Sequence, residues 1–350
     1  MALMRGGLIE RLASWDAFLA VLTGATLTYA AIAVPNFATA FNISQAIAGV
    51  SERALIVLPM VLLIIAREID LSVASMLALS SVVFGVAVQA GAPISLAILA
   101  ALLTGLVGGA LNGALVTMLG LPSLVVTLGT LAVFRGVGYI ILGSGSVNEF
   151  PDAFTDFGID TVGGSILPWT IVPFLILAPI SAVLLQKGAV GRRIYAIGGN
   201  PDVAGYAGVR VGRIRLALFT ASGVISALAG VVFTARLANA RADNAVGLEL
   251  DVITIALLGG VSVFGGRGHL TGVFFALVLI AALRNILGLL QIGGDAQGTV
   301  IGLLLIGSLL LSTVTQRLFA SASALLASPN SSGSNPGNPP EARSSPTIGA

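Results

Sequence analysis

Long apolar stretches fill most of this chain, and short polar segments separate them. Crossing the roughly 30 Å hydrocarbon core of a bilayer takes about 20 residues of helix, and most of the stretches reach this length. Polar positions do not recur on one helical face, which is typical of helices surrounded by lipid. The pattern predicts an all-α integral membrane protein with about ten transmembrane helices, at residues 17–34, 47–66, 71–90, 93–117, 122–142, 167–186, 214–235, 252–264, 270–290 and 297–315.

The polar segment 67–72 separates two of these stretches with almost no loop between them. It contains Glu68, Asp70 and Ser72, and charged residues at membrane depth usually face a protein interior or a wet cavity. One interpretation is a short turn at the membrane surface, in which Asp70 or Ser72 caps the next helix. The other is a helix broken at membrane depth, whose polar groups line a solute path. The sequence leaves both open.

A second acidic pair, Glu249 and Asp251, precedes the apolar run of the short stretch 252–264, and the two motifs share the order acid, apolar residue, acid. That stretch is too short to cross alone, so it is either a half-helix or extends back past Asp251. Asn112 follows the first motif and Asn285 the second, which indicates two inverted repeats with broken helices, unless the match is chance. Each asparagine either bonds a neighbouring helix or contacts solute.

The composition excludes a soluble protein and several kinds of chemistry. Apolar residues other than glycine make up 56% of the 350 residues, and only 9% are charged, against about 25% in soluble domains. With no cysteine and a single histidine, thiolate or histidine metal sites are excluded. The only lysine, Lys187, does not lie in a phosphate-binding loop motif. We therefore expect no cofactor, no metal, no catalytic residue and, from the net charge of +2, no nucleic-acid partner.

The loops indicate an orientation. Segment 187–215 carries six basic residues and one acid, whereas segment 143–166 carries four acids and no basic residue. The positive-inside tendency places segment 187–215 in the cytoplasm and segment 143–166 outside. Ten spans then put both termini in the cytoplasm. We expect residues 1–16 to form the cytoplasmic N-terminus, 17–315 the transmembrane domain and 316–350 a cytoplasmic tail that is disordered from about 328, where Ser, Pro, Asn and Gly dominate.

Within segment 187–215 the sequence predicts a short helix. Asn200 suits the N-cap, Pro201 the first helical position, and Asp202 complements the helix dipole. Small residues would leave a surface that another protein can approach closely. We expect either a docking helix or an ordinary basic loop, and the candidate docking residues are Gly199, Asn200, Pro201, Asp202, Ala204 and Gly208.

Three stretches together resemble the permease subunits of carbohydrate ATP-binding-cassette (ABC) importers, of the ribose, xylose, galactose, rhamnose and autoinducer-2 type. The resemblance covers roughly residues 15–315. Its motifs are Ile69-Asp70-Leu71-Ser72-Val73; Pro122-Ser123 with Thr127-Leu128-Gly129-Thr130 and Arg135-Gly136; and the run from Gly191-Arg192-Arg193 through Gly198-Gly199-Asn200 to Glu249-Leu250-Asp251 and Gly265-Gly266-Arg267-Gly268.

The resemblance implies a multi-pass permease in a bacterial inner membrane without an ATPase site of its own. Its implied partners are a separate cytoplasmic ATP-binding subunit, a periplasmic or lipoprotein sugar-binding protein, and a second permease subunit, identical or not. The family's coupling segment maps onto about residues 200–209. Its aspartate motifs map onto Asp70 and Asp251. Together with the other polar residues singled out above, they give the candidate path residues Glu68, Asp70, Ser72, Asn112, Glu249, Asp251 and Asn285.

The sequence also departs from the family. Ala66-Arg67-Glu68 stands where Thr-Gly-Gly is common, and this difference favours rhamnose, another deoxysugar or a pentose as the solute. An ion-coupled secondary transporter that uses Glu68, Asp70 and Asp251 as ion sites is the alternative function. A membrane enzyme with two acids acting as a pair is a further one.

Overall fold

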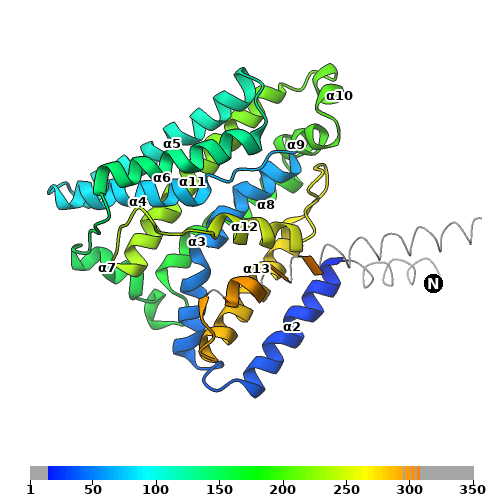
Figure 1. Cartoon of the computed structure of the whole chain (residues 1–350). Coiled ribbons are helices and arrows are strands. Elements are labelled where there is room, and N and C mark those ends of the chain that lie inside the picture. The colour runs from blue at the N-terminus through cyan, green and yellow to red at the C-terminus, as the bar shows by residue number, and fades with distance from the viewer. Residues whose placement is uncertain (1–14, 295, 301, 304–305, 308–350) are drawn as a thin grey trace, which may run out of the picture. The chain divides into compact units, whose positions relative to one another are not determined.

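The computed structural model describes residues 15–294, 296–300, 302–303 and 306–307. The expectations for the start of segment 1–16, for the tail 316–350 and for most of the span 297–315 fall outside these residues. Within them the chain is helical and contains no strand (Figure 1). The helices are α2 (Trp15–Ala33), α3 (Ala40–Ile65), α4 (Val73–Gln89), α5 (Ile94–Met118), α6 (Ser123–Leu142), α7 (Asp152–Ile159), η1 (Val162–Gly164), η2 (Trp169–Ile171), α8 (Val172–Gln186), α9 (Ala189–Gly199), α10 (Pro201–Tyr206), α11 (Val211–Leu237), α12 (Leu248–Leu258) and α13 (Leu270–Leu289).

Seven of these segments are long and apolar enough to cross a membrane, which confirms the all-α membrane fold for the part of the chain described: α2, α3, α5, α6, η2 with α8, α11 and α13. The predicted span 71–90 is the 17-residue α4. Helix α12, in the predicted span 252–264, begins at Leu248, so it extends back past Asp251 as one alternative expected, and with 11 residues it is also as short as a half-helix. The predicted end at 264 was wrong, because the helix ends at Leu258. The acid Asp251 lies inside the first turn of a short helix rather than before it.

Helix α11 lies at the centre of the packing and contacts α3, α4 and α5. Glycines allow the closest approach: a Cβ atom on Gly105 or Gly109 of α5 would collide with backbone carbonyls of α11, and one on Gly223 of α11 would collide with α5. The glycine run of α5 is thus a helix-packing surface, as membrane helices commonly use. In contrast, α2 packs along α13, and most of its surface is exposed.

The two loops of opposite charge lie at opposite ends of α11. Helix α10 leads through a four-residue link into the start of α11 at Val211. Helix α7, in the acidic segment, packs against the far end of α11, where Gly158 lies on the backbone of Ala235. Figure 1 shows the two short helices separated in this way. Helix α11 is long enough to cross a bilayer, and α7 and α10 lie at its two ends.

Candidate functional site

The segment 66–72 enters the middle of the helix packing instead of turning back at one end. Helix α3 ends at Ile65, and α4 begins at Val73. Along this segment, Glu68 forms an ion pair with Arg215 near the start of α11 (2.8 Å), whereas Asp70 reaches Ser222 near the middle of α11. Of the two interpretations of this motif, the geometry favours the broken helix.

Asp70 is the centre of a buried polar cluster that joins three helices. Only 1% of the residue is exposed. Its carboxylate accepts hydrogen bonds from the Ser72 backbone N–H (3.0 Å), the Ser72 hydroxyl (2.6 Å) and the Ser222 hydroxyl (2.8 Å). Asn112 of α5 donates to the same Ser72 hydroxyl (2.8 Å). Ser72 occupies the N-cap position of α4, but its side chain makes no capping hydrogen bond. At the start of this helix, it is the Asp70 carboxylate that accepts a backbone N–H, that of Ser72.

Asp251 is held by two arginines from different helices. Its carboxylate accepts hydrogen bonds from Arg53 Nε of α3 (3.0 Å) and from Arg284 Nη2 of α13 (2.7 Å to each oxygen). The three side chains remain partly exposed, unlike the cluster around Asp70. Their neighbour Glu249 lies near Arg135 of α6, and its Oε2 is buried without a hydrogen-bond partner among the described residues.

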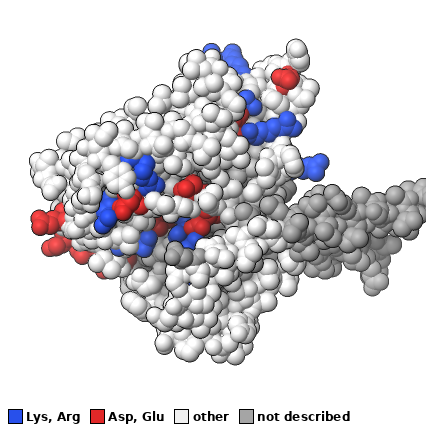
Figure 2. Space-filling view, in the orientation of Figure 1, with Lys and Arg blue, Asp and Glu red and all other residues white. Residues whose placement is uncertain are grey.

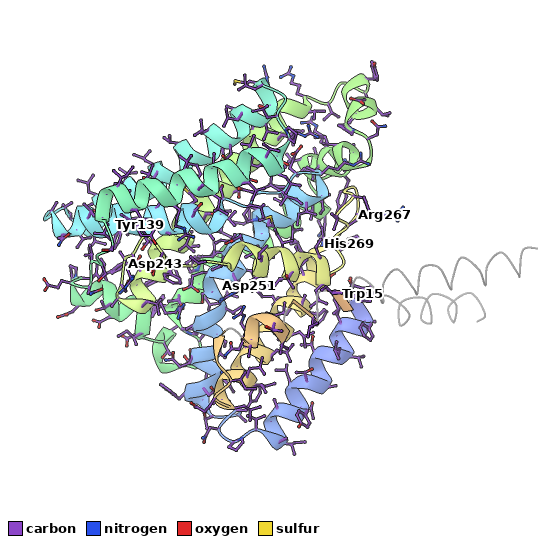
Figure 3. The ribbon with its side chains drawn as sticks, in the orientation of Figure 1. Trp15, Tyr139, Asp243, Asp251, Arg267 and His269 are labelled. Carbon is purple, nitrogen blue, oxygen red and sulfur yellow. The ribbon has the colours of Figure 1, made fainter. Side chains whose placement is uncertain are left out.

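These charges form part of a polar patch, in which side chains of both signs lie close together. Figure 2 shows acidic and basic side chains gathered in the middle of one face, and Figure 3 places Asp243 and Asp251 there. Arg135 fastens the adjoining loop, donating to the backbone carbonyls of Ala242 and Asn244 (2.7 Å each). Charged groups are rare on lipid-facing surface, so this patch is a place where a protein or aqueous environment is required.

The asparagines make interhelical hydrogen bonds, one of the two roles expected for them. The side-chain amides of Asn285 of α13 and Asn42 of α3 each donate a hydrogen bond to the other, at 2.8 and 2.9 Å. Asn112 reaches the Asp70 cluster, but Asn285 does not contact Asp251. It is Arg284, the preceding residue, that bonds Asp251 from α13.

The two broken regions, α3 to α4 and α11 to α12, have the same order of elements. In each, a long helix (α3 or α11) is followed by a non-helical segment, a shorter helix and a further long helix. The acids lie in the non-helical segment before α4 in the first region and in the first turn of α12 in the second. In each, a carboxylate pairs with an arginine from the long helix of the other region: Glu68 with Arg215 of α11, and Asp251 with Arg53 of α3. Helix α4 runs along α11 from Ser222 toward Thr234, whereas α12 runs back to Trp15. This arrangement supports an inverted repeat.

Helix α10 is short, exposed and capped as the sequence indicates. The Asn200 side chain accepts hydrogen bonds from the N–H groups of Asp202 (2.9 Å) and Val203 (3.1 Å), and Pro201 is the first helical residue. The prediction that small residues form the exposed surface is wrong for Ala204, which is buried. Instead, Val203 (61% exposed) and Tyr206 (93% exposed) project outward. Gly208 takes a positive φ of 83° just after the helix, which suits glycine.

Sequence reasoning missed most of the basic partners in these sites. Arg53, Arg215 and Arg284 hold the acids, and Arg236 of α11 pairs with the buried Glu52 of α3 (2.8 Å). The available signal was the adjacent pair Glu52-Arg53 inside the apolar span 47–66, since a charge in such a run needs a partner.

Several known proteins are similar to this chain over most of its length. The D-allose transport system permease protein of Escherichia coli (strain K12) is 35% identical over 306 residues, which are 87% of this chain and 93% of that protein. The L-arabinose transport system permease protein of the same organism is 33% identical over 305 residues (87% and 92%). The autoinducer 2 import system permease protein of Klebsiella pneumoniae is 34% identical over 258 residues (72% and 77%).

No solved structure matches the chain. The family described as branched-chain amino acid transport system / permease component matches residues 42–309. This range contains both broken-helix regions and α10. The chain therefore belongs to the branched-chain amino acid transport system / permease component family.

Proposed function

We propose that this chain is the permease subunit of an ABC sugar importer, which forms the membrane path for a monosaccharide and is driven by a separate ATP-binding subunit. The observation that carries the proposal is the pair of broken regions, in each of which an arginine from the long helix of the other region holds an acid beside the break. Transporters build solute sites from discontinuous helices of this kind. Three relatives named as sugar or autoinducer permeases support the same function.

The proposed orientation places α10 and both ends of the transmembrane domain at the cytoplasmic face of a bacterial inner membrane. The basic segment 187–215 supports this side for α10. The start of α2 lies at the same end, because Trp15 Nε1 donates to the Leu258 carbonyl at the end of α12 (2.7 Å), and the loop after α12 contacts Gly198 of α9. Cysteine labelling from either side of intact cells tests the assignment, since the chain has no cysteine of its own.

Helix α10 is the proposed docking site for the ATP-binding subunit. It is exposed, and an apolar side chain and an aromatic ring, Val203 and Tyr206, project from it. Exposed aromatic residues are frequent anchors in protein interfaces. The acidic helix α7 at the opposite end is a candidate contact for the external sugar-binding protein, and a second permease subunit would face the polar patch around Asp251 across the sugar path.

The path residues proposed from the sequence fall into two groups, one partly exposed and one bonded within the subunit. Glu249 and Asp251 lie in the partly exposed polar patch and are the stronger candidates for contact with sugar. Glu68, Asp70, Ser72 and Asn112 are buried and bonded within the subunit, and Asn285 is bonded to Asn42. We propose that these five residues hold the broken helices in place and shape the path indirectly.

Purification and reconstitution test the function. The full chain should capture an ATP-binding subunit from its native membranes, and the complex in liposomes should import a sugar only with ATP and the external binding protein. A panel of D-allose, L-arabinose, L-rhamnose, D-ribose and autoinducer 2 identifies the solute. Rhamnose remains a prediction from the Arg67-Glu68 motif, because the relatives above are named for other solutes. Uptake that persists without the ATP-binding subunit and collapses with an uncoupler would instead show an ion-coupled transporter.

A further inference from the structure

One side chain, Arg67, ties together three segments that are distant in the sequence. Its Nε–H is shared between the backbone carbonyls of Gly198 at the end of α9 and Phe264 in the α12–α13 loop, at 2.8 Å each. Its Nη2 donates to the Gly199 carbonyl, also at 2.8 Å. We call Arg67, Gly198, Gly199 and Phe264 the Arg67 joint.

The backbones around the joint are packed too closely to slide past one another. The Ile65 carbonyl at the end of α3 accepts a hydrogen bond from the Gly266 N–H (2.9 Å). A Cβ atom on Gly198 would collide with that same carbonyl. Tyr195 of α9 adds a further link, since its hydroxyl donates to the Gly268 carbonyl (2.6 Å). Burial raises the pKa of the Tyr195 phenol, so this hydroxyl keeps its proton at physiological pH.

The joint lies between the proposed docking helix and both broken regions. Gly199 is followed directly by Asn200, the N-cap of α10. On the other side, Arg67 is followed by Glu68, whose ion pair with Arg215 holds the α3–α4 break against α11. Through Phe264 the joint also reaches the loop that follows α12, the short helix of the second broken region. A displacement of α10 therefore has a short, bonded route to both regions.

An arginine suits this position for two reasons. Its guanidinium presents five N–H donors in a rigid fork, so one side chain can bond several carbonyls, whereas a lysine is a single flexible ammonium group. The carbonyls at the end of α9 also carry the negative end of the helix dipole, which favours a cation. Yet Arg67 has a φ of 65°, in the left-handed region that glycine adopts more easily. The backbone alone would favour glycine here.

We propose that Arg67 is a positioning residue that makes α10, the α3–α4 break and the α12–α13 loop move as one body. The proposal rests on the proposed function, in which the ATP-binding subunit moves α10. Replacing Arg67 with glycine removes every hydrogen bond of the side chain and also relieves the strain of the positive φ. Any loosening in this variant is therefore due to the lost hydrogen bonds and not to backbone strain.

The experiment measures whether the distance between α10 and the α12–α13 loop stays fixed. Because the chain contains no cysteine, Gly205→Cys and Phe264→Cys give a unique pair for spin labels. Gly205 of α10 is exposed and has open space where a Cβ atom would lie, and Phe264 is 85% exposed. The distance distribution between the labels is measured by pulsed electron paramagnetic resonance. The full chain is examined alone and with its ATP-binding subunit, without nucleotide and trapped with ATP and vanadate. With Arg67 present we expect one narrow distance in every state.

Arg67→Gly should broaden the distribution at least twofold, and in the complex the distance should differ between nucleotide states. The ATPase rate and the amount of bound ATP-binding subunit should stay within twofold of those of the labelled chain that keeps Arg67, because the two chains have the same docking surface. Arg193→Ala is the matched control: Arg193 lies exposed on α9 and makes no side-chain hydrogen bond within the described residues. It should leave the distribution unchanged.

An Arg67→Gly distribution as narrow as that of the unaltered chain would overturn the proposal. If Arg67→Gly does not accumulate in the membrane, Arg67→Lys provides the same test: a broadened distribution supports the joint and an unchanged one refutes it. The measurement on the isolated chain separates this proposal from the proposed function. If no ATP-binding subunit is captured, the function fails, while the width of the distribution still decides whether Arg67 locks the segments.

Discussion

Replacing Asp70 with alanine tests whether this acid anchors the broken helix or lines a solute path. The carboxylate is 1% exposed and accepts three hydrogen bonds, two from Ser72 and one from Ser222. Alanine removes the acceptor and leaves three buried donors without this partner. The start of α4 then loses its attachment to α11.

The expected loss of stability is large. A buried donor left without a partner costs about 1–3 kcal/mol, so three of them cost about 3–9 kcal/mol. Whole domains are stable by only about 5–15 kcal/mol. Ser222→Ala removes a single donor and keeps the carboxylate, so it should cost about 1–3 kcal/mol. We therefore expect stability to fall in steps, from the unaltered chain through Ser222→Ala to Asp70→Ala.

The assay is the amount of protein in the membrane fraction, followed by thermal unfolding of the purified chain in detergent, monitored by size-exclusion chromatography. We expect little Asp70→Ala protein and a lowered unfolding temperature, with Ser222→Ala between it and the unaltered chain. Asp243→Ala is the control, because Asp243 pairs with Arg241 at an exposed position, where ion pairs contribute little. A normally stable Asp70→Ala chain that fails to transport would refute the anchoring role and make Asp70 a path residue.

Three further outcomes are expected. Asn200→Ala removes the N-cap of α10, which costs about 0.5–2 kcal/mol of helix stability, and should weaken capture of the ATP-binding subunit in a pull-down. Gly198→Ala should lower the unfolding temperature and abolish uptake, because its Cβ meets the Ile65 carbonyl, whereas Gly199→Ala has open space and should be close to normal in both assays. Asp251→Ala should accumulate better than Asp70→Ala, since its two arginine partners are partly exposed, and should reduce uptake by the reconstituted complex.

Local features of this protein could be read directly from the order of its residues. The spans were predictable because the thickness of the membrane demands about 20 apolar residues in one run. The Asn200 cap was predictable because a cap, its proline and its acid are neighbours in the chain. The start of α12 was left open, because its first turn contains Glu249 and Asp251 and hydropathy alone does not show whether charged residues belong to a membrane helix.

The partners of the buried charges were decided only by the tertiary structure. The sequence shows that Glu68 and Asp251 require compensation, because an unpaired charge in an apolar interior is costly. It does not show that Arg215 pairs with one and Arg53 with the other, since each pair joins helices far apart in the chain. The Arg67 joint has the same origin. Its acceptors are backbone carbonyls, which every residue carries, so only the packing of α3, α9 and the α12–α13 loop selects which of them the guanidinium meets.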